Sequence, residues 1–182
     1  MFAQVIRATI RTLLFQQGPQ DFPYARDVTR TVLPIAVLAN YLQLRLTVSP
    51  VAAVALSMLE LAALALAVGL LLNMRGLINR LQQTVNTLFA TNAVFTLLLL
   101  PLVVELAPIL QQVAENPEAL EAADLPAHLR FGMIGLSLWN LAVISHVLRH
   151  ALSLGIGLGA GLAICCTVFV YVVVQGAASL FS

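Results

Sequence analysis

The stretch that decides the fold is WNLAVISHVLRHAL, residues 139–152, in which an apolar run ends with two histidines and an arginine. The apolar part has the character of a buried or membrane helix, and His146, Arg149 and His150 gather at one end of it. Long basic side chains at the end of an apolar helix extend toward the aqueous boundary of a membrane. The stretch therefore predicts a helix whose C-terminal end lies at a membrane surface.

The composition of the whole chain agrees with this interpretation. Of its 182 residues, 60% are hydrophobic and 9% are charged, and the mean hydropathy is +0.96. A soluble domain is about 45–50% apolar and about 25% charged, so a soluble globule is excluded. Because one crossing needs about 20 apolar residues, the chain has room for at most five or six helical spans in a single domain. The net charge of +1, with no lysine, argues against binding nucleic acid, which needs a concentrated basic surface.

Residues 1–17 are predicted to form an amphipathic helix in the plane of the membrane surface. At 100° per residue, one side carries Phe2, Val5, Ile6, Ile10 and Leu13, and the other carries Gln4, Arg7, Ala8 and Arg11. Arginines opposite an apolar face are typical of a helix that lies in the interface with its basic side toward anionic head groups. The alternative is a helix that packs on its own protein. Gly18, Pro19 and Pro23 then interrupt the helix.

Five transmembrane spans follow, so the expected fold is an all-α integral membrane protein with an N-terminal interfacial helix and one domain, residues 1–182. The predicted spans are about residues 31–46, 51–72, 85–106, 132–151 and 154–176. Pro101 should kink the third span where neighbouring helices can compensate. Residues 108–130 are predicted to form an acidic connection outside the membrane, with a short surface helix that begins near Asn116.

The positions of the arginines predict the orientation of the chain. With five spans, Arg45 and Arg130 lie on one side of the membrane, and the other side carries Arg7, Arg11, Arg26, Arg30, Arg75, Arg80 and Arg149. The side with more arginines is normally cytoplasmic. We therefore expect a cytoplasmic N-terminus and, in a bacterium, an inner-membrane protein with a periplasmic C-terminus.

Glu60 is the most informative single residue because an ionisable side chain in the middle of a span is costly and should face protein. At a rise of about 1.5 Å per residue, five polar residues fall at a similar depth of roughly 15–18 Å. This predicted polar layer consists of Asn40, Glu60, Thr96, Asn140 and Cys165. Two roles are open for such a layer. Its hydrogen bonds fix the packing of the helices, or it forms a proton or ion relay through Glu60.

His146 and His150 are four residues apart and so project from one face of a helix, a spacing that suits a metal ion such as zinc. A metal site needs three or four ligands, however, and Val147 occupies the position at which a metalloprotease carries its catalytic Glu. The alternatives are that His146, Arg149 and His150 mark the cytoplasmic boundary, or that they bind a partner protein. No catalytic residues and no cofactor are predicted.

Glycines at the start of the fifth span predict a close helix contact. Gly155 and Gly159 form one pair of small residues four apart, and Gly157 and Gly161 form a second. Such pairs let a second helix approach closely, either within the chain or from another copy of it.

Three segments resemble the bacterial five-pass branch of the Yip-domain (Ypt-interacting-protein) membrane protein family. They are LLFQQGPQDF (residues 13–22), LQQTVNTLFATNAVFTLLLLPL (residues 81–102) and HVLRHAL (residues 146–152). The acidic DLxGP-type signature of the eukaryotic members is absent. The resemblance implies an all-helical membrane domain without catalytic residues.

The expected function is therefore non-enzymatic: a membrane scaffold or interaction protein that contacts the lipid bilayer and a second copy or another membrane protein. The alternative is a small transporter or channel subunit that uses the polar layer around Glu60. A cavity that reaches Glu60 would favour the alternative, whereas tight packing around Glu60 would favour the scaffold.

Overall fold

The computed structural model describes residues 2–115 and 125–180, and within these residues the chain is helical and contains no strand. Six α-helices and two short 3₁₀ helices are present in the described residues. In chain order they are α1 (Phe2–Leu13), η1 (Pro19–Asp21), α2 (Arg26–Leu44), α3 (Pro50–Met74), η2 (Ile78–Arg80), α4 (Leu81–Glu115), α6 (Ala127–Leu152) and α7 (Ile156–Ala178).

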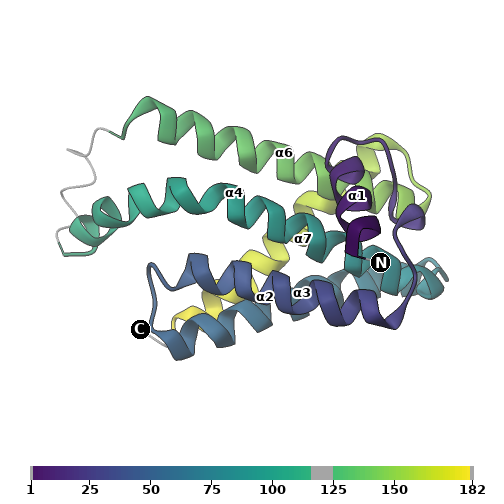
Figure 1. Cartoon of the computed structure of the whole chain (residues 1–182), viewed down its shortest axis with the longest axis horizontal. Coiled ribbons are helices and arrows are strands. Elements are labelled where there is room, and N and C mark those ends of the chain that lie inside the picture. Colours follow the sequence, from purple (N-terminus) through teal and green to yellow (C-terminus); the bar gives the residue numbers. More distant parts are fainter. Residues whose placement is uncertain (1, 116–124, 181–182) are drawn as a thin grey trace.

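The five long helices α2, α3, α4, α6 and α7 run back and forth between the two ends of an elongated bundle (Figure 1). Helix α2 packs against α3 and α4, whereas α6 packs against α4 and α7, and α7 also contacts α3. Helix α1 lies across one end of the bundle, beside the beginning of α4 and the end of α6 (Figure 1). The C-terminal end of α7 lies at the opposite end (Figure 1).

Four segments are long and apolar enough to cross a membrane: α3, residues 78–109, α6 and α7. They indicate a helical multi-pass membrane protein, as the composition predicted. Helix α2 is not among them, because Asp27, Arg30 and Asn40 lower the apolarity of its 19 residues. The fifth predicted crossing therefore stays a prediction.

The helix boundaries differ from the predicted spans mainly at α2, which begins at Arg26 rather than Thr31, and at α4 and α6. Helix α4 continues through Pro101 and Pro108 to Glu115, well beyond the predicted end at residue 106. Each interior proline removes one backbone hydrogen-bond donor, but neither proline ends the helix. Helix α6 begins at Ala127 rather than Gly132. The predicted surface helix near Asn116 lies outside the described residues.

Ser49 and Pro50 start helix α3 after the turn that follows α2. The Ser49 side chain accepts a hydrogen bond from the backbone N–H of Ala52 at 3.4 Å, and Pro50 is the first residue of α3. A serine N-cap satisfies one of the free donors at a helix start, and proline loses nothing at the next position.

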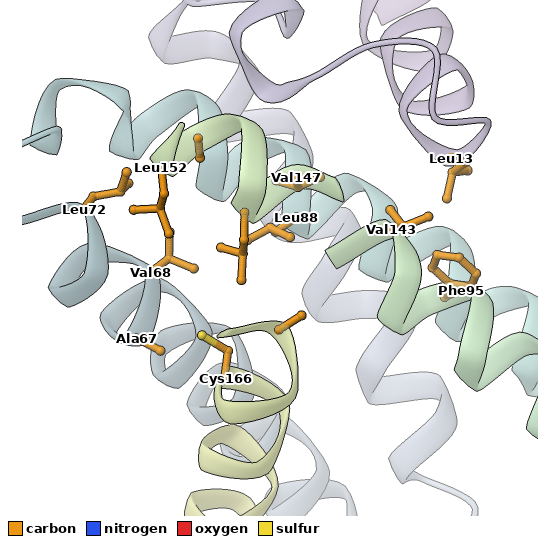
Figure 2. Close-up of a cluster of buried hydrophobic side chains, with 13 residues drawn as sticks. Leu13, Ala67, Val68, Leu72, Leu88, Phe95, Val143, Val147, Leu152 and Cys166 are labelled. Carbon is orange, nitrogen blue, oxygen red and sulfur yellow. The ribbon is translucent and has the colours of Figure 1, made fainter. Parts of the chain in front are cut away.

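The stretch 139–152 lies in the centre of the larger hydrophobic core, between α4 and α7. Figure 2 shows Leu152 of α6 on the side of Val68 and Leu72 of α3, and Val143 of α6 on the side of Leu13 and Phe95. A second cluster joins α1, the segment after it, α2 and α4, and includes Val5, Phe22, Val28 and Phe89. Residues 139–152, which carry the predicted membrane boundary, are thus also part of the protein core.

Only one of the four glycines predicted for helix packing lies against another helix. A Cβ atom added at Gly159 would lie 2.7 Å from Arg149 Cβ and 3.1 Å from the backbone oxygen of Ser145, both on α6. A Cβ atom added at Gly155, Gly157 or Gly161 would meet nothing within 4 Å. The α6–α7 contact therefore requires glycine at position 159, and the other three glycines are open on the outside of the bundle.

We expect Gly159→Ala to destabilise the protein, because overpacking a close contact costs about 1–3 kcal/mol. Gly157→Ala is the matched control on the same helix and should be neutral or slightly stabilising, since alanine favours a helix over glycine by about 1 kcal/mol. Thermal unfolding of both variants in detergent measures the difference. Equal unfolding temperatures for the two variants would show that Gly159 is not a packing position.

Candidate functional site

Polar side chains from four helices line one cavity of about 190 Å³ in the middle of the bundle. Its lining residues are Asn40, Gln43 and Leu44 of α2, Glu60 of α3, Asn92, Phe95, Thr96 and Leu99 of α4, and Asn140 of α6. At about 1.5 Å per residue, Glu60 lies about 15 Å from the start of α3 and about 21 Å from its end. Glu60 is therefore at mid-depth in α3, whereas Gln43 and Leu44 of the lining are the last two residues of α2.

Four of the five residues of the predicted polar layer line this cavity: Asn40, Glu60, Thr96 and Asn140. Cys165 does not, because it is exposed on α7, whereas its neighbour Cys166 is buried in the core. Adjacent residues on a helix point about 100° apart, so burying Cys166 turns Cys165 outward.

A hydrogen-bonded network joins α2 to α4 at the cavity. The side-chain oxygen Oδ1 of Asn40 accepts one bond from Asn92 Nδ2 and one from Thr96 Oγ1, each at 3.1 Å. Asn92 was not part of the predicted layer, although it lies one turn before Thr96 and hence on the same face of α4. Gln43, also missed, lies in the last turn of α2, where a polar residue is expected at a helix end.

The network leaves one buried donor without an acceptor. The side chain of Asn40 is only 3% exposed, and its Nδ2 atom has no hydrogen-bond partner. The Glu60 carboxyl interacts with the side-chain amides of Asn40 and Asn92. Its contact with Asn40 Nδ2, however, does not have the geometry of a hydrogen bond. Because a buried polar group without a partner costs about 1–3 kcal/mol, this donor favours a polar occupant of the cavity.

At the end of the bundle that carries α1, side chains hold residues 13–25, which we call the N-terminal connection. Trp139 donates its indole N–H to the backbone oxygen of Leu13 at 3.1 Å, and His146 Nε2 lies 3.0 Å from the backbone oxygen of Gln17. A carbonyl oxygen only accepts, so His146 carries a proton on Nε2. Both donors come from the stretch 139–152.

Two glutamines at the start of α4 complete the attachment of the N-terminal connection. Gln83 Nε2 donates to the backbone oxygens of Gln20 at 3.3 Å and Phe22 at 3.1 Å. Gln82 Nε2 donates to the backbone oxygen of Ala25 at 3.3 Å. These carbonyls lie outside the α-helices, and side chains at the start of α4 supply their hydrogen-bond donors.

His146 is buried, unlike Arg149 and His150, the other two residues of the predicted cytoplasmic boundary. His146 is 8% exposed and packs against the rings of Phe15 and His150, so it does not extend toward lipid head groups. Arg149 and His150 are partly exposed, and Arg149 Nη2 lies 3.3 Å from His150 Nε2. Among the described residues no group of three His, Cys, Asp or Glu side chains could hold a metal ion with these histidines.

Two arginines of the predicted cytoplasmic set cap the end of α6. Arg80 Nη1 donates to the backbone oxygen of Ala151 at 2.9 Å and to Ser153 Oγ at 3.1 Å, and Arg75 Nη2 approaches the backbone oxygen of Leu152 at 3.5 Å. The last carbonyls of a helix lack intrahelical partners, and a positive charge there also opposes the negative end of the helix dipole.

Helix α1 has three faces rather than the two predicted. Its protein-facing side comprises Val5, Ala8, Thr9, Thr12 and Leu13. A second side leaves Phe2, Ile6, Ile10 and Leu14 exposed, and a third exposes Arg7 and Arg11. The helix therefore packs on its own protein and still presents an apolar stripe beside an arginine-bearing one, which is the pattern of an interfacial helix.

We expect Gln83→Leu to loosen the N-terminal connection, because it removes two hydrogen bonds that are each worth about 0.5–1.5 kcal/mol. Hydrogen exchange in detergent should become faster in residues 13–25 and stay unchanged in α3. Gln175→Leu, the same change at an exposed position of α7, is the control. Unchanged exchange in residues 13–25 of the Gln83 variant would show that these bonds do not hold the connection.

The segments that resemble Yip-domain proteins include the groups that hold the N-terminal connection. Residues 13–22 form most of that connection, residues 81–102 begin with Gln82 and Gln83, and residues 146–152 begin with His146. Comparisons of the chain with family models, curated proteins and solved structures return no match. Membership of the Yip-domain family therefore stays a prediction.

Proposed function

We propose that the protein is a non-enzymatic inner-membrane protein of the Yip-domain type that acts as a scaffold or interaction partner through its cytoplasmic end. The supporting observation is the attachment of α1 and the N-terminal connection to the bundle by side chains of α4 and α6. This attachment holds Arg7 and Arg11 on an exposed face instead of leaving them on a free tail. A fixed basic and apolar surface suits binding to anionic lipid together with a protein partner.

The proposed topology has five crossings, with α2 as the first. Helix α2 runs alongside α3 and α4, and its residues Leu33, Leu38 and Leu42 are exposed on the outside of the bundle. Its one central polar residue, Asn40, is turned inward and bonded to α4. With α2 as a span, the N-terminus is cytoplasmic and the C-terminus periplasmic, in agreement with the distribution of arginines.

We expect a reporter that is active only in the periplasm to be active when fused after residue 180, and inactive when fused before α1. The same reporter in the α2–α3 turn, after residue 47, tests the α2 crossing directly and should be active. Four crossings without α2 would put the N-terminus, this turn and the C-terminus on the same side, so equal reporter activity at all three positions would show that α2 does not cross.

The scaffold function is tested with a photo-cross-linking side chain at position 7 or 11 in native membranes. We expect adducts with protein at these exposed positions of α1. The control is position 138, an exposed apolar position of α6 in its membrane-spanning part, where lipid adducts should dominate. Lipid adducts alone at positions 7 and 11 would contradict a protein-binding role for this face.

The cavity around Glu60 favours a second candidate, a small transporter or channel subunit. If the scaffold proposal is correct, the protein in liposomes should conduct no more protons under a membrane potential than empty liposomes. A proton flux that is lost in Glu60→Gln and kept in Glu105→Gln would favour the second candidate. Glu105 is a suitable control because it is exposed on α4 and pairs with His128, away from the cavity.

A further inference from the structure

We propose that the cavity around Glu60 binds an alkali-metal cation through the Glu60 carboxylate and the neutral oxygens of α2, α4 and α6. This inference gives a ligand to the second candidate function, but binding does not require transport. It depends on the lining of the cavity, the direction of the hydrogen-bonded network and the unpartnered donor of Asn40.

The direction of the network leaves side-chain oxygen atoms of α4 available to a ligand, while the second N–H group of Asn92 interacts with the Glu60 carboxyl. Asn92 uses Nδ2, and Thr96 uses its hydroxyl hydrogen, to bind Asn40 Oδ1. Asn92 therefore keeps its side-chain oxygen, and Thr96 keeps the lone pairs of its hydroxyl oxygen, for another partner. Both residues line the cavity.

The remaining polar lining adds oxygen ligands and no soft ones. Gln43 and Asn140 each bring an amide oxygen, Glu60 brings a carboxylate, and neither His nor Cys is among the lining residues. Carboxylate, amide and hydroxyl oxygens are ligands of hard cations, whereas zinc, copper and iron favour sites with nitrogen or sulfur. The volume of about 190 Å³ accommodates a cation with a few water molecules.

The charge of the cavity favours a single positive charge. Glu60 is the one ionisable residue in the lining, and no basic side chain faces it there. An ionised carboxylate inside a membrane protein needs a compensating charge, and one alkali-metal cation provides it. Calcium needs six to eight oxygen ligands, usually with several carboxylates, and magnesium needs a near-ideal octahedron.

Protonation of Glu60 is the competing way to neutralise the cavity, and the neighbouring amides argue against it. The side-chain amides of Asn40 and Asn92 face the Glu60 carboxyl, and no acceptor is bonded to Asn40 Nδ2. An ionised carboxylate attracts these N–H groups more strongly than a protonated one, and a cation also requires the ionised form. The same state of Glu60 thus suits the amides and the ion.

The cavity extends toward the end of the bundle that lies opposite α1. Gln43 and Leu44, which are the last two residues of α2, line the cavity together with Glu60. The turn that follows them, between α2 and α3, lies at that end. A cation would therefore enter from the side of the α2–α3 turn.

The test is thermal unfolding of the whole protein in detergent, in sodium chloride, potassium chloride or choline chloride at equal ionic strength. Oxygen ligands cannot coordinate choline as they coordinate a metal ion, because methyl groups surround its charge, so it serves as the reference cation. We expect sodium or potassium to raise the unfolding temperature by about 3–6 °C when the cation is at roughly ten times its dissociation constant. Glu60→Gln should abolish this rise, and Glu105→Gln should keep it. Equal unfolding temperatures in the three salts, or a rise that persists in Glu60→Gln, would overturn the proposal.

Binding of radioactive sodium to the purified protein provides a second readout if Glu60→Gln does not fold. For this assay, Glu60→Asp keeps the charge and should still bind sodium, whereas Asn140→Leu removes one ligand oxygen and should weaken binding. Sodium binding that is equal in the parent protein and Asn140→Leu would argue against the cavity as its site. Cation binding without any ion flux in liposomes would keep the site and reject transport, and flux without cation binding would do the reverse.

Discussion

The structure depends on one constraint of the bilayer: a polar group at mid-depth finds no water and must be satisfied by the protein itself. Asn40 illustrates how the chain meets this constraint in part, because its side-chain oxygen is satisfied within the bundle and its Nδ2 atom has no partner. Its side-chain oxygen binds Asn92 and Thr96, so that a residue unfavourable in lipid becomes a link between α2 and α4. Helix α2 is the least apolar of the long helices and belongs to the bundle because its polar residue has partners there.

At the end of the bundle that carries α1, side chains likewise supply partners to backbone carbonyls that lie outside the α-helices. The N-terminal connection is largely non-helical, and its carbonyl oxygens are placed against the beginning of α4 and the end of α6. Trp139, His146 and Gln83 supply donors to these carbonyls, while Arg80 supplies them to the last carbonyls of α6. His146 is in this case a buried hydrogen-bond donor to the backbone and not a surface charge.

The sequence predicted the depth of the polar residues better than their direction around each helix. Depth follows from a fixed rise per residue, so Asn40, Glu60, Thr96 and Asn140 could be grouped before any packing was known. Direction requires an uneven distribution of apolar residues, and α7 is apolar on all sides, which is why Cys165 could not be placed. The partner of His146 is a backbone oxygen 129 positions away, a contact that no local pattern reveals.

The cavity and the N-terminal connection are also joined to each other, through Phe95 and Trp139. Phe95 lines the cavity and meets the ring of Trp139 edge-on at 5.1 Å, and Trp139 in turn donates to the backbone oxygen of Leu13. A change in either aromatic ring therefore disturbs both regions, and its effects cannot separate a scaffold from a transporter. Glu60 and Gln83 do not share this contact, since Glu60 faces only the cavity and Gln83 holds only the connection. Substitutions at these two positions, combined in one double variant, should have additive effects on stability because the residues have no common partner.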